Sequence, residues 1–443
     1  MIILNLGLIM YYSIRYTVNF QIPRGMKDWD VDNHKYLEYV RNIFLDNCNI
    51  YNFNLMEPSP VEMLSTLEAR SGQDIKNEIY FFKDKNNRDL ALRFDLTVGT
   101  VRHICSKKNV PLPIRVGTFS SMFRYDEPQY GRSRWFYQCN TEIFDSKEID
   151  SDVEIIDFAS NLFYKLGIDC VIEIGDRTLI ESFVKKQFPN IDSHKTENLF
   201  RLLDKMNKKT KNELYLYAKE CSIDENEVDV LFDFVKTNQT SSDLFSEYLG
   251  KDSDLTQLVN LLQDRGLNNF KINPGIVRGL DYYNGIVFEI FDKNNYELGA
   301  LGGGGRYDVL PKIFGRDDLG ATGFAAGVDR IILSLQKKNI VIDRPSKLFS
   351  VCYIGAQNKP IAYKIAKKLR NLDLCTTYDF AEKSLKKQLH KASELGVDYV
   401  LLIAPNEIAQ SEIILRDMNS RTETKVNVSA VEDYVMKLNS HNP

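Results

Sequence analysis

Cysteine and histidine are sparse in this sequence and do not occur in metal-binding patterns. The seven cysteines form no C-x-x-C pair, and none of the five histidines has a spacing such as H-E-x-x-H. The missing patterns argue against a zinc site, and the scattered cysteines do not suggest a disulfide framework. We therefore expect a reducing, cytoplasmic compartment.

Long apolar runs and glycine-rich phosphate loops are also missing. The apolar start, Met1 to Tyr12, is too short to span a bilayer and has neither a basic n-region nor a small-residue cleavage site. We interpret residues 1–20 as an N-terminal extension, or as the result of a start codon assigned too early, rather than as a targeting segment, and we expect no membrane association. Since neither G-x-G-x-x-G nor a P-loop occurs, a bound nucleotide would have to be held in another way.

The net charge is small and unevenly distributed. The chain carries −4 in total, whereas residues 346–443 contain 11 Lys and 3 Arg against 11 acidic residues. Hydrophobic residues make up 43% and charged residues 27%, which is typical of a folded globular protein. The overall charge does not indicate a nucleic-acid binder, but the C-terminal part is relatively basic.

The length of 443 residues predicts two or three domains. Apolar residues at helical spacing predict a helix over 33–47. A Lys-, Glu-, Asp- and Leu-rich pattern predicts a helical insertion at about 176–269. After residue 344, strands are predicted at 348–354 and 399–404 and helices at 360–372 and 383–395. This alternation predicts a small α/β domain with a largely parallel sheet.

Residues 123–142 predict an antiparallel hairpin with a long polar loop. Its second strand places four side chains on one face by period-two alternation: Phe136, Gln138, Asn140 and Glu142. This face could be the solvated side of an edge strand or the wall of a binding pocket. Three arginines around the loop, Arg124, Arg132 and Arg134, favour the pocket, because guanidinium groups make bidentate contacts with phosphates.

The same segment resembles motif 2 of class II aminoacyl-tRNA synthetases, in the form found in the histidyl enzymes. Five further blocks resemble that family in its order: Pro23–Asp28, Leu92–Thr97, Val277–Asn284, Gly304–Asp308, and Gly323–Arg330 as motif 3. Taken singly, Gly302–Gly305 could be a tight turn, and Tyr282 and Tyr283 could be core aromatics. Six blocks in order identify the chain as a member of the histidyl-tRNA synthetase family.

The resemblance implies an α+β catalytic domain over 21–335 with the class II synthetase fold, an antiparallel sheet flanked by helices. The helical insertion would lie within this domain, and residues 345–443 would form an α/β anticodon-binding domain. The implied activity is ATP-dependent formation of histidyl-adenylate, followed by transfer of L-histidine to the 3′ end of tRNA(His). Mg²⁺ is expected with ATP, although its protein ligands are unassigned. Motif 1, at 33–60, implies a homodimer.

The resemblance also implies roles for individual residues. Arg124 and Arg278 would be catalytic through contact with the α-phosphate. The histidine site would comprise Asp95, Thr97, Arg124, Gln138, Glu142, Arg278, Tyr282, Tyr283 and Tyr307. The ATP site would comprise Arg124, Asp126, Phe136, Arg278 and Arg330, with adenine between Phe136 and Arg330. In the tail, Lys383, Lys386 and Lys387 could contact the anticodon or simply form a solvated helix face.

Two other functions fit parts of the sequence. A histidine-binding regulatory paralogue of the ATP phosphoribosyltransferase regulatory subunit type would share the fold without charging tRNA, but that group usually loses the catalytic arginines and the C-terminal domain. A pure RNA-binding module would leave the ATP arginines unexplained. Glu127 stands in the motif 2 loop where bacterial relatives often have arginine, which leaves the reading of the tRNA end open.

Overall fold

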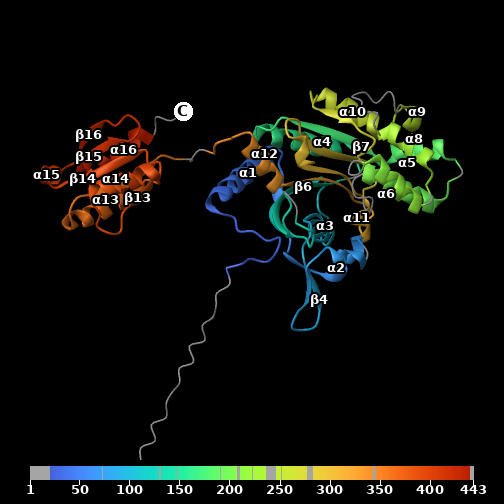
Figure 1. The fold of residues 1–443 in the computed structure, drawn as a ribbon, viewed down its shortest axis with the longest axis horizontal. Helices are drawn as coiled ribbons and strands as arrows, with labels where there is room; N and C mark the ends of the chain where they lie inside the picture. The colour runs from blue at the N-terminus through green and yellow to red at the C-terminus, as the bar shows by residue number, and fades with distance from the viewer. Residues whose placement is uncertain are drawn as a thin grey trace, which may run out of the picture. The chain divides into compact units, whose positions relative to one another are not determined.

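The chain forms two compact units, Met1–Ile340 and Val341–Pro443 (Figure 1). The computed structural model describes residues 20–71, 73–128, 131–145, 147–189, 191–206, 210–221, 223–235, 246–250, 252–276, 283–342 and 346–439. The segment 1–19 of the expected extension lies outside these ranges, as do Arg278 and Tyr282.

An eight-stranded sheet forms the centre of the first unit, with the order β1-β5-β6-β11-β10-β9-β7-β8. Its strands are β1 (Asn54–Leu55), β5 (Ile114–Phe123), β6 (Trp135–Asp145), β7 (Cys170–Asp176), β8 (Phe270–Ile272), β9 (Ile286–Asp292), β10 (Gly302–Arg306) and β11 (Gly320–Gly327). The six strands from β5 to β7 pair antiparallel, and only the edge strands β1 and β8 pair parallel. The predicted antiparallel sheet and the β5–β6 hairpin are confirmed.

Three helices pack on one face of this sheet: α1 (Val31–Ile50), α4 (Ile149–Lys165) and α12 (Val328–Lys337). The helix predicted over 33–47 is confirmed as α1. It begins earlier than predicted because Asp30 caps its first turn, accepting a hydrogen bond from the backbone N–H of Asn33 at 2.8 Å. Leu37, Val40 and Phe44 form its buried stripe.

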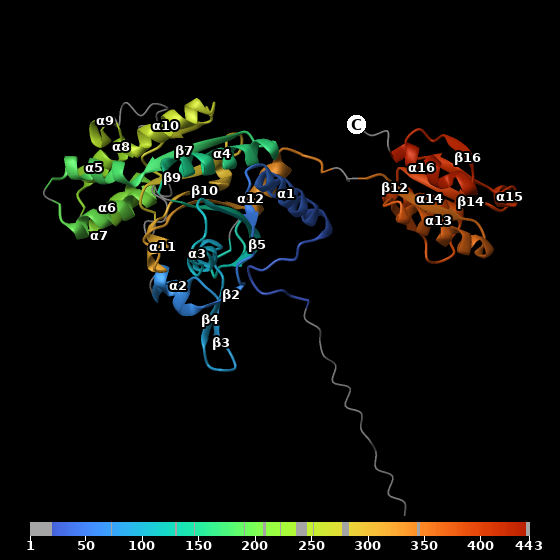
Figure 2. The same ribbon diagram turned by 180° about the vertical axis from the view of Figure 1, so that it is seen from behind.

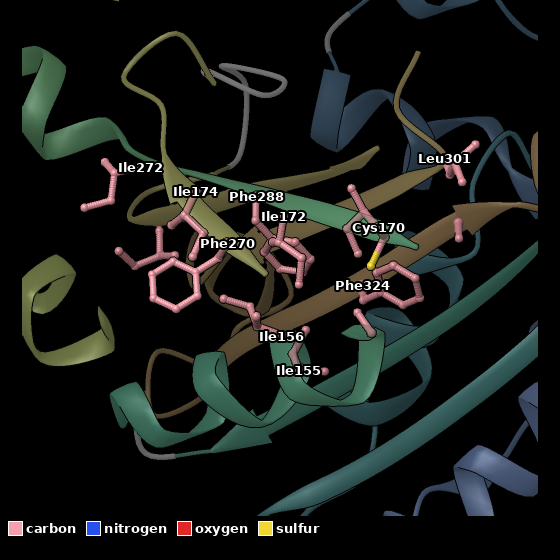
Figure 3. Packing of buried hydrophobic residues seen from close by; sticks show 14 of the residues in the cluster. Ile155, Ile156, Cys170, Ile172, Ile174, Phe270, Ile272, Phe288, Leu301 and Phe324 are labelled. Atoms are coloured by element: carbon pink, nitrogen blue, oxygen red, sulfur yellow. The ribbon is translucent and has the colours of Figure 1, made fainter. Parts of the chain in front are cut away.

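The largest core lies between the sheet and these helices. Ile155 and Ile156 of α4 point toward strand residues that include Ile172 of β7 and Phe324 of β11 (Figure 3). Phe158, on the same helix, is fully buried, and its ring lies 5.1 Å from that of Phe53 and 6.1 Å from that of Phe44. This apolar layer fixes the sheet, so that the opposite face can carry polar side chains.

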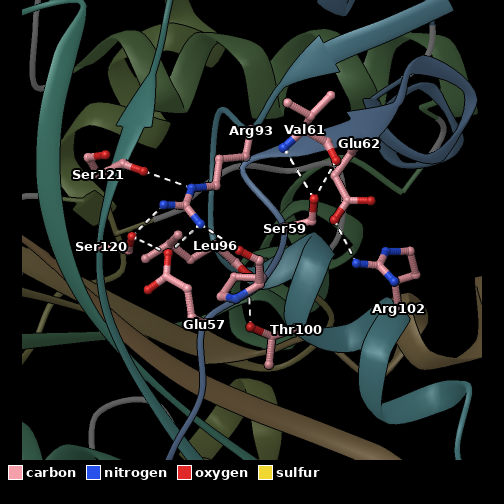
Figure 4. Close-up of polar contacts among 11 residues, drawn as sticks. Glu57, Ser59, Val61, Glu62, Arg93, Leu96, Thr100, Arg102, Ser120 and Ser121 are labelled. Carbon is pink, nitrogen blue, oxygen red and sulfur yellow. Dashed lines mark hydrogen bonds and ion pairs between the residues drawn. The ribbon is translucent and has the colours of Figure 1, made fainter.

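The opposite face is covered by α2 (Leu64–Ser71), α3 (Thr97–Cys105) and α11 (Val309–Ile313), with a small sheet of β2 (Val61–Met63), β4 (Asp89–Leu92) and β3 (Phe81–Lys83). Arg93 joins this layer to β5 (Figure 4). Its guanidinium donates to Glu57 at 2.8 Å, to the Pro58 carbonyl at 2.6 Å and to the Ser121 carbonyl at 2.8 Å. Arg93 is only 5% exposed, so these bonds offset the loss of its hydration.

The predicted helical insertion consists of six described helices that gather beside β7 in both ribbon views (Figure 2). They are α5 (Arg177–Gln187), α6 (Ser193–Met206), α7 (Lys211–Glu220), α8 (Glu225–Val235), α9 (Ser246–Leu249) and α10 (Asp254–Asp264). Asp176 ends β7 and caps α5 by accepting from the Thr178 backbone N–H at 2.7 Å. The change from strand to helix therefore takes place at one capping residue.

Glycines allow β10 and β11 to approach closely in the middle of the sheet. The tight-turn interpretation of Gly302–Gly305 is wrong, because these residues form β10. A Cβ on Gly304 would overlap the carbonyl oxygen of Gly323. Gly323 itself pairs in register with Glu142 of β6, and a Cβ there would overlap the Glu142 carboxylate.

The second unit contains a five-stranded sheet in the order β13-β12-β14-β15-β16. Its elements are β12 (Leu348–Tyr353), α13 (Lys359–Asn371), β13 (Cys375–Tyr378), α14 (Leu385–Glu394), β14 (Tyr399–Ile403), α15 (Pro405–Ala409), β15 (Glu412–Asp417), β16 (Glu423–Asn427) and α16 (Val431–Asn439). The four predicted elements are present. The largely parallel sheet needs correction: β15 and β16 pair antiparallel, since a short turn joins them as a hairpin.

Among the residues that the structure describes, no helix combines the length and the apolar character needed to cross a membrane.

Replacing Phe158 with alanine tests the apolar layer. The cavity left in the core should lower the free energy of unfolding of the first unit by about 3–5 kcal/mol. Urea unfolding followed by tryptophan fluorescence measures this unit selectively, because both tryptophans, Trp29 and Trp135, belong to it. Tyr164→Ala is the matched control: it lies on the same helix but is 80% exposed, and it should change the stability little.

Replacing Gly323 with alanine tests the close approach at the Glu142 carboxylate. The added methyl group should displace this side chain and lower the free energy of unfolding by about 1–3 kcal/mol. Gly327→Ala, on the same strand, is the control, because its Cβ would meet no atom within 4 Å. Equal stability of the two variants would contradict the close approach.

Candidate active site

A cavity of about 290 Å³ opens on the polar face of the large sheet. Ten of the residues predicted for the site line it: Asp95, Thr97, Arg124, Asp126, Phe136, Gln138, Glu142, Tyr283, Tyr307 and Arg330. They come from segments more than two hundred residues apart in the sequence. The two other predicted residues, Arg278 and Tyr282, lie outside the described residues.

The alternating row on β6 forms the floor of this cavity. All four members, Phe136, Gln138, Asn140 and Glu142, are among its lining residues. The solvated-edge interpretation is wrong for this strand, because β6 lies between β5 and β11 and Glu142 is 3% exposed. On the other face of the strand, Cys139 and Ile143 belong to the apolar core. Period-two alternation therefore separates the binding face from the core.

Two hydroxyl groups hold the buried Glu142 carboxylate. Thr97, at the start of α3, donates its hydroxyl to Oε1 at 2.8 Å, and the hydroxyl of Tyr307 donates to Oε2. The ring of Tyr283 meets that of Tyr307 edge-on, with 6.4 Å between centroids. A carboxylate offers about four acceptor positions, and Glu142 lines the cavity, where a ligand can meet its oxygens. Its negative charge favours a ligand that carries N–H donors.

The side chain of Arg124 is held at the end of β5. Its Nε donates to the Phe94 carbonyl at 2.9 Å, and its guanidinium carbon lies 5.3 Å from the centroid of the Phe136 ring. Its backbone N–H donates to the Arg134 carbonyl at 2.9 Å, which joins the two arms of the hairpin. These contacts fix the guanidinium plane at the cavity wall, where it can meet an anionic group.

Arg330 enters the cavity from the first turn of α12. Its Nη1 donates to the Ala300 carbonyl at 2.7 Å, close to Gly299, which has a φ of +70°. A Cβ at Gly299 would lie 3.2 Å from Nη1. The glycine therefore leaves room for this guanidinium beside the loop before β10. On the opposite rim, Asp95 accepts from the Val98 backbone N–H at 3.0 Å and holds the first turn of α3.

One predicted phosphate-binding arginine does not reach the cavity. Arg132 lines it, but Arg134 is absent from its walls and lies over the ring of Tyr125 at 4.0 Å. The Nε of Arg134 also donates to the Asp126 carbonyl at 2.9 Å. The expectation that three loop arginines face a polyphosphate is therefore corrected to two. Alternation could not reveal this, because the loop is not a regular strand.

Sequence reasoning placed Asn140 in the alternating row without giving it a role, and it did not single out Ser133 or Asp329, which also line the cavity. Asn140 is 2% exposed, and its Oδ1 has no hydrogen-bond partner among the described residues. Its place in the alternating row was a usable signal. Asp329 also lines the cavity and accepts from the Ser133 hydroxyl at 3.2 Å. Asp329 belongs to the motif 3 block, but its pairing with Ser133 could not be predicted, because it brings together residues about two hundred positions apart.

The Gly304–Asp308 block places side chains on both sides of the sheet. Tyr307 points to the cavity, whereas Arg306 binds Asp152 of α4 at 2.6 Å and Asp145 of β6 at 3.2 Å. Burial raises the pKa of Asp152 to about 6, although the charge of Arg306 opposes this shift. Arg306 therefore has a structural position, and Tyr307 alone brings this block into the site.

Within the described ranges, histidine, cysteine and carboxylate side chains nowhere gather in groups of three or more that could bind a metal ion. The carboxylates on the cavity walls, such as Asp126 and Asp329, form no such group. Such a distribution is compatible with Mg²⁺ that is held mainly by phosphate oxygens and water, because this ion retains much of its hydration.

Comparison with known proteins agrees with the arrangement of the site. The family profile described as histidyl-tRNA synthetase matches residues 25–331, and that of an anticodon binding domain matches residues 348–438. The histidine–tRNA ligase of Pyrococcus horikoshii is 31% identical, covering 90% of this chain and 94% of its own. That of Methanococcus aeolicus is 30% identical, covering 94% of this chain and all of its own.

Solved structures share the fold at lower identity. The histidyl-tRNA synthetase from Nostoc sp. PCC 7120 superposes with a TM-score of 0.78 at 23% identity, covering 95% of this chain and 100% of that one. A Bacillus halodurans protein described as an ATP phosphoribosyltransferase regulatory subunit/histidyl-tRNA synthetase reaches 0.70 at 20% identity, covering 87% and 98%. The sequence matches extend through both units, and the chain therefore belongs to the histidyl-tRNA synthetase family.

Proposed function

We propose that the cavity on the polar face of the sheet binds L-histidine and ATP side by side and forms histidyl-adenylate. The observation that carries this proposal is the buried Glu142 carboxylate, held by Thr97 and Tyr307, in the same cavity as Arg124 and Arg330. An anionic pocket next to two guanidinium groups suits a cationic side chain next to a polyphosphate.

Histidine recognition is assigned to the floor of the cavity. Glu142, together with Tyr283 and Tyr307, would pair the imidazole nitrogens. Asp95, Thr97 and Gln138 would bind the α-amino group, whose positive charge matches the Asp95 carboxylate. Tyr282 belongs to the same proposed set by its motif. A pocket that pairs both ring nitrogens rejects amino acids without them, because its buried polar groups would be left without partners.

Activation requires the histidine carboxylate to attack the α-phosphate of ATP, which brings two anions together. Arg124 would contact both anions and stabilise the charge that spreads over the phosphoryl oxygens. Arg278 is assigned the same α-phosphate contact by its motif. Phe136 and Arg330 would enclose the adenine, and Asp126 would lie at the nucleotide. Mg²⁺, when bound to the phosphates, would neutralise part of their charge.

Transfer to tRNA is the second proposed step, and it uses the 3′ end of tRNA(His). No histidine or cysteine is among the described cavity residues, so no side chain of these types is assigned as a general base. The second unit would bind the anticodon. Lys383 is engaged with Asp379 at 3.0 Å, whereas Lys386 and Lys387 are exposed on α14, which makes these two the better candidates for RNA contacts.

Assembly and compartment also remain proposals. A homodimer through motif 1 is supported by the edge position of β1, whose Leu55 is 53% exposed. Ile50, at the end of α1, is 65% exposed and extends this apolar surface. A cytoplasmic location is supported by the seven cysteines, which are all free thiols.

The proposed activity is tested by ATP–pyrophosphate exchange with each amino acid in turn, followed by charging of tRNA(His). We expect exchange only with histidine, and charging in the same preparation. Binding of histidine without exchange would support a regulatory function instead, which is the alternative raised by the structural likeness to the Bacillus halodurans protein.

Replacing Glu142 with glutamine tests the imidazole site. The loss of the charged acceptor should raise the KM for histidine by about 10- to 100-fold. The KM for ATP should change little, because the nucleotide contacts are assigned to other residues. Both constants are measured by pyrophosphate exchange with one substrate held at saturation.

Glu173→Gln is the matched control for this substitution. Glu173 is also a buried carboxylate of the large sheet, and it accepts from Asn273 at 2.5 Å, but it lies on β7 and does not line the cavity. We expect Glu173→Gln to change the melting temperature but to leave the KM for histidine unchanged. Equal effects of the two substitutions on this KM would contradict the assignment of Glu142.

A further inference from the structure

The N-terminal segment 24–29 lies against the candidate ATP site from outside. A second cavity, of about 360 Å³, is lined by this segment, by the hairpin loop and by α12. The two cavities share Gly131, Arg132, Ser133 and Asp329 in their walls. The shared residues therefore form a partition, with the ATP site on one side and the segment 24–29 on the other.

The segment holds both arms of the hairpin loop. The Gly25 carbonyl accepts from the backbone N–H of Arg134 on the returning arm at 2.7 Å. Arg24 pairs with Glu127 on the outgoing arm at 2.7 Å. Gly25 has a φ of +83°, and a Cβ there would lie 2.7 Å from the Arg134 side chain. This backbone contact therefore requires glycine.

Lys27 connects the N-terminal segment with Asp329 of the partition. Its ammonium binds one carboxylate oxygen of Asp329 at 2.5 Å, and the other oxygen accepts from the Ser133 hydroxyl at 3.2 Å. The Asp329 side chain is 10% exposed and that of Lys27 is 34% exposed, whereas Arg24 and Glu127 are 74% and 68% exposed. The Lys27–Asp329 pair is thus the better shielded of the two, and shielding strengthens an ion pair.

We propose that Lys27 is a positioning residue for ATP. By binding Asp329, Lys27 fixes the first turn of α12 against Ser133 of the hairpin loop. Arg330 belongs to this turn, and Arg132 belongs to the loop. Lys27 does not line the cavity, so it acts through these residues rather than by touching the nucleotide. The inference rests on the proposed function in one respect: that ATP occupies the first cavity.

Removing the charge of Lys27 separates positioning from general stability. Lys27→Met keeps most of the aliphatic stem, and it should raise the KM for ATP by about five- to ten-fold, because Asp329 loses its cationic partner. The KM for histidine should stay within about two-fold of the wild-type value, because the Glu142 pocket lies at the other end of β6. Lys27→Arg restores the charge and should recover most of the ATP affinity.

A charge exchange and a surface control complete the test. In Lys27→Asp/Asp329→Lys the pair is reversed, and its KM for ATP should be lower than that of Lys27→Asp alone. Lys35→Met removes an exposed ion pair, Lys35–Asp32 at 3.0 Å on α1, and should leave both KM values unchanged.

The outcomes separate this inference from the proposed function. Wild-type protein without pyrophosphate exchange would refute the function itself. Wild-type exchange with an unchanged KM for ATP in Lys27→Met would refute the positioning role alone. Equal increases in both KM values, together with a lowered melting temperature, would also refute it, because they would show a general structural contact.

Discussion

A carboxyl group buried in the middle of a β-sheet needs hydrogen-bond donors and room for its oxygens, and Glu142 imposes this requirement on the first unit. Thr97 of α3 and Tyr307 after β10 supply the hydroxyl groups, and Gly323 of β11 supplies the space. These three residues come from different elements, so the strand register and the helix position must be correct at the same time. The surrounding fold can be understood as the structure that holds this register.

The two faces of the sheet differ in the side chains that they carry, and this difference allows the sheet to meet the requirement. One face is apolar and packs against α1, α4 and α12, with Phe158 and Phe324 at its centre. The other face presents the β6 row to the cavity. The apolar layer stabilises the sheet, and the polar face can therefore carry groups that contribute little to stability. Side chains of the candidate site and of the apolar core therefore alternate along the same strand.

The cavity also depends on segments that are not part of the sheet. Residues 24–29 contact both arms of the hairpin loop and the first turn of α12 through Gly25 and Lys27. Arginines on loops have more freedom than those on strands, and contacts from outside reduce it. A loop that binds a polyphosphate can in this way be ordered before the ligand arrives. The arrangement connects the first residues of the catalytic unit with motif 2, about one hundred residues later, and with motif 3, about three hundred residues later.

The sequence by itself determined the family, several of the elements and most of the candidate site residues. Period-two alternation placed Glu142 with Gln138 and Phe136, because this pattern is local and survives without knowledge of the fold. Only the tertiary structure decided that β6 is an interior strand, that Gly302–Gly305 form β10, and that Arg134 turns away from the cavity. It also decided the pairing of Lys27 with Asp329. The physical reason is that these features depend on contacts between residues far apart in the chain, which local propensity and spacing do not encode.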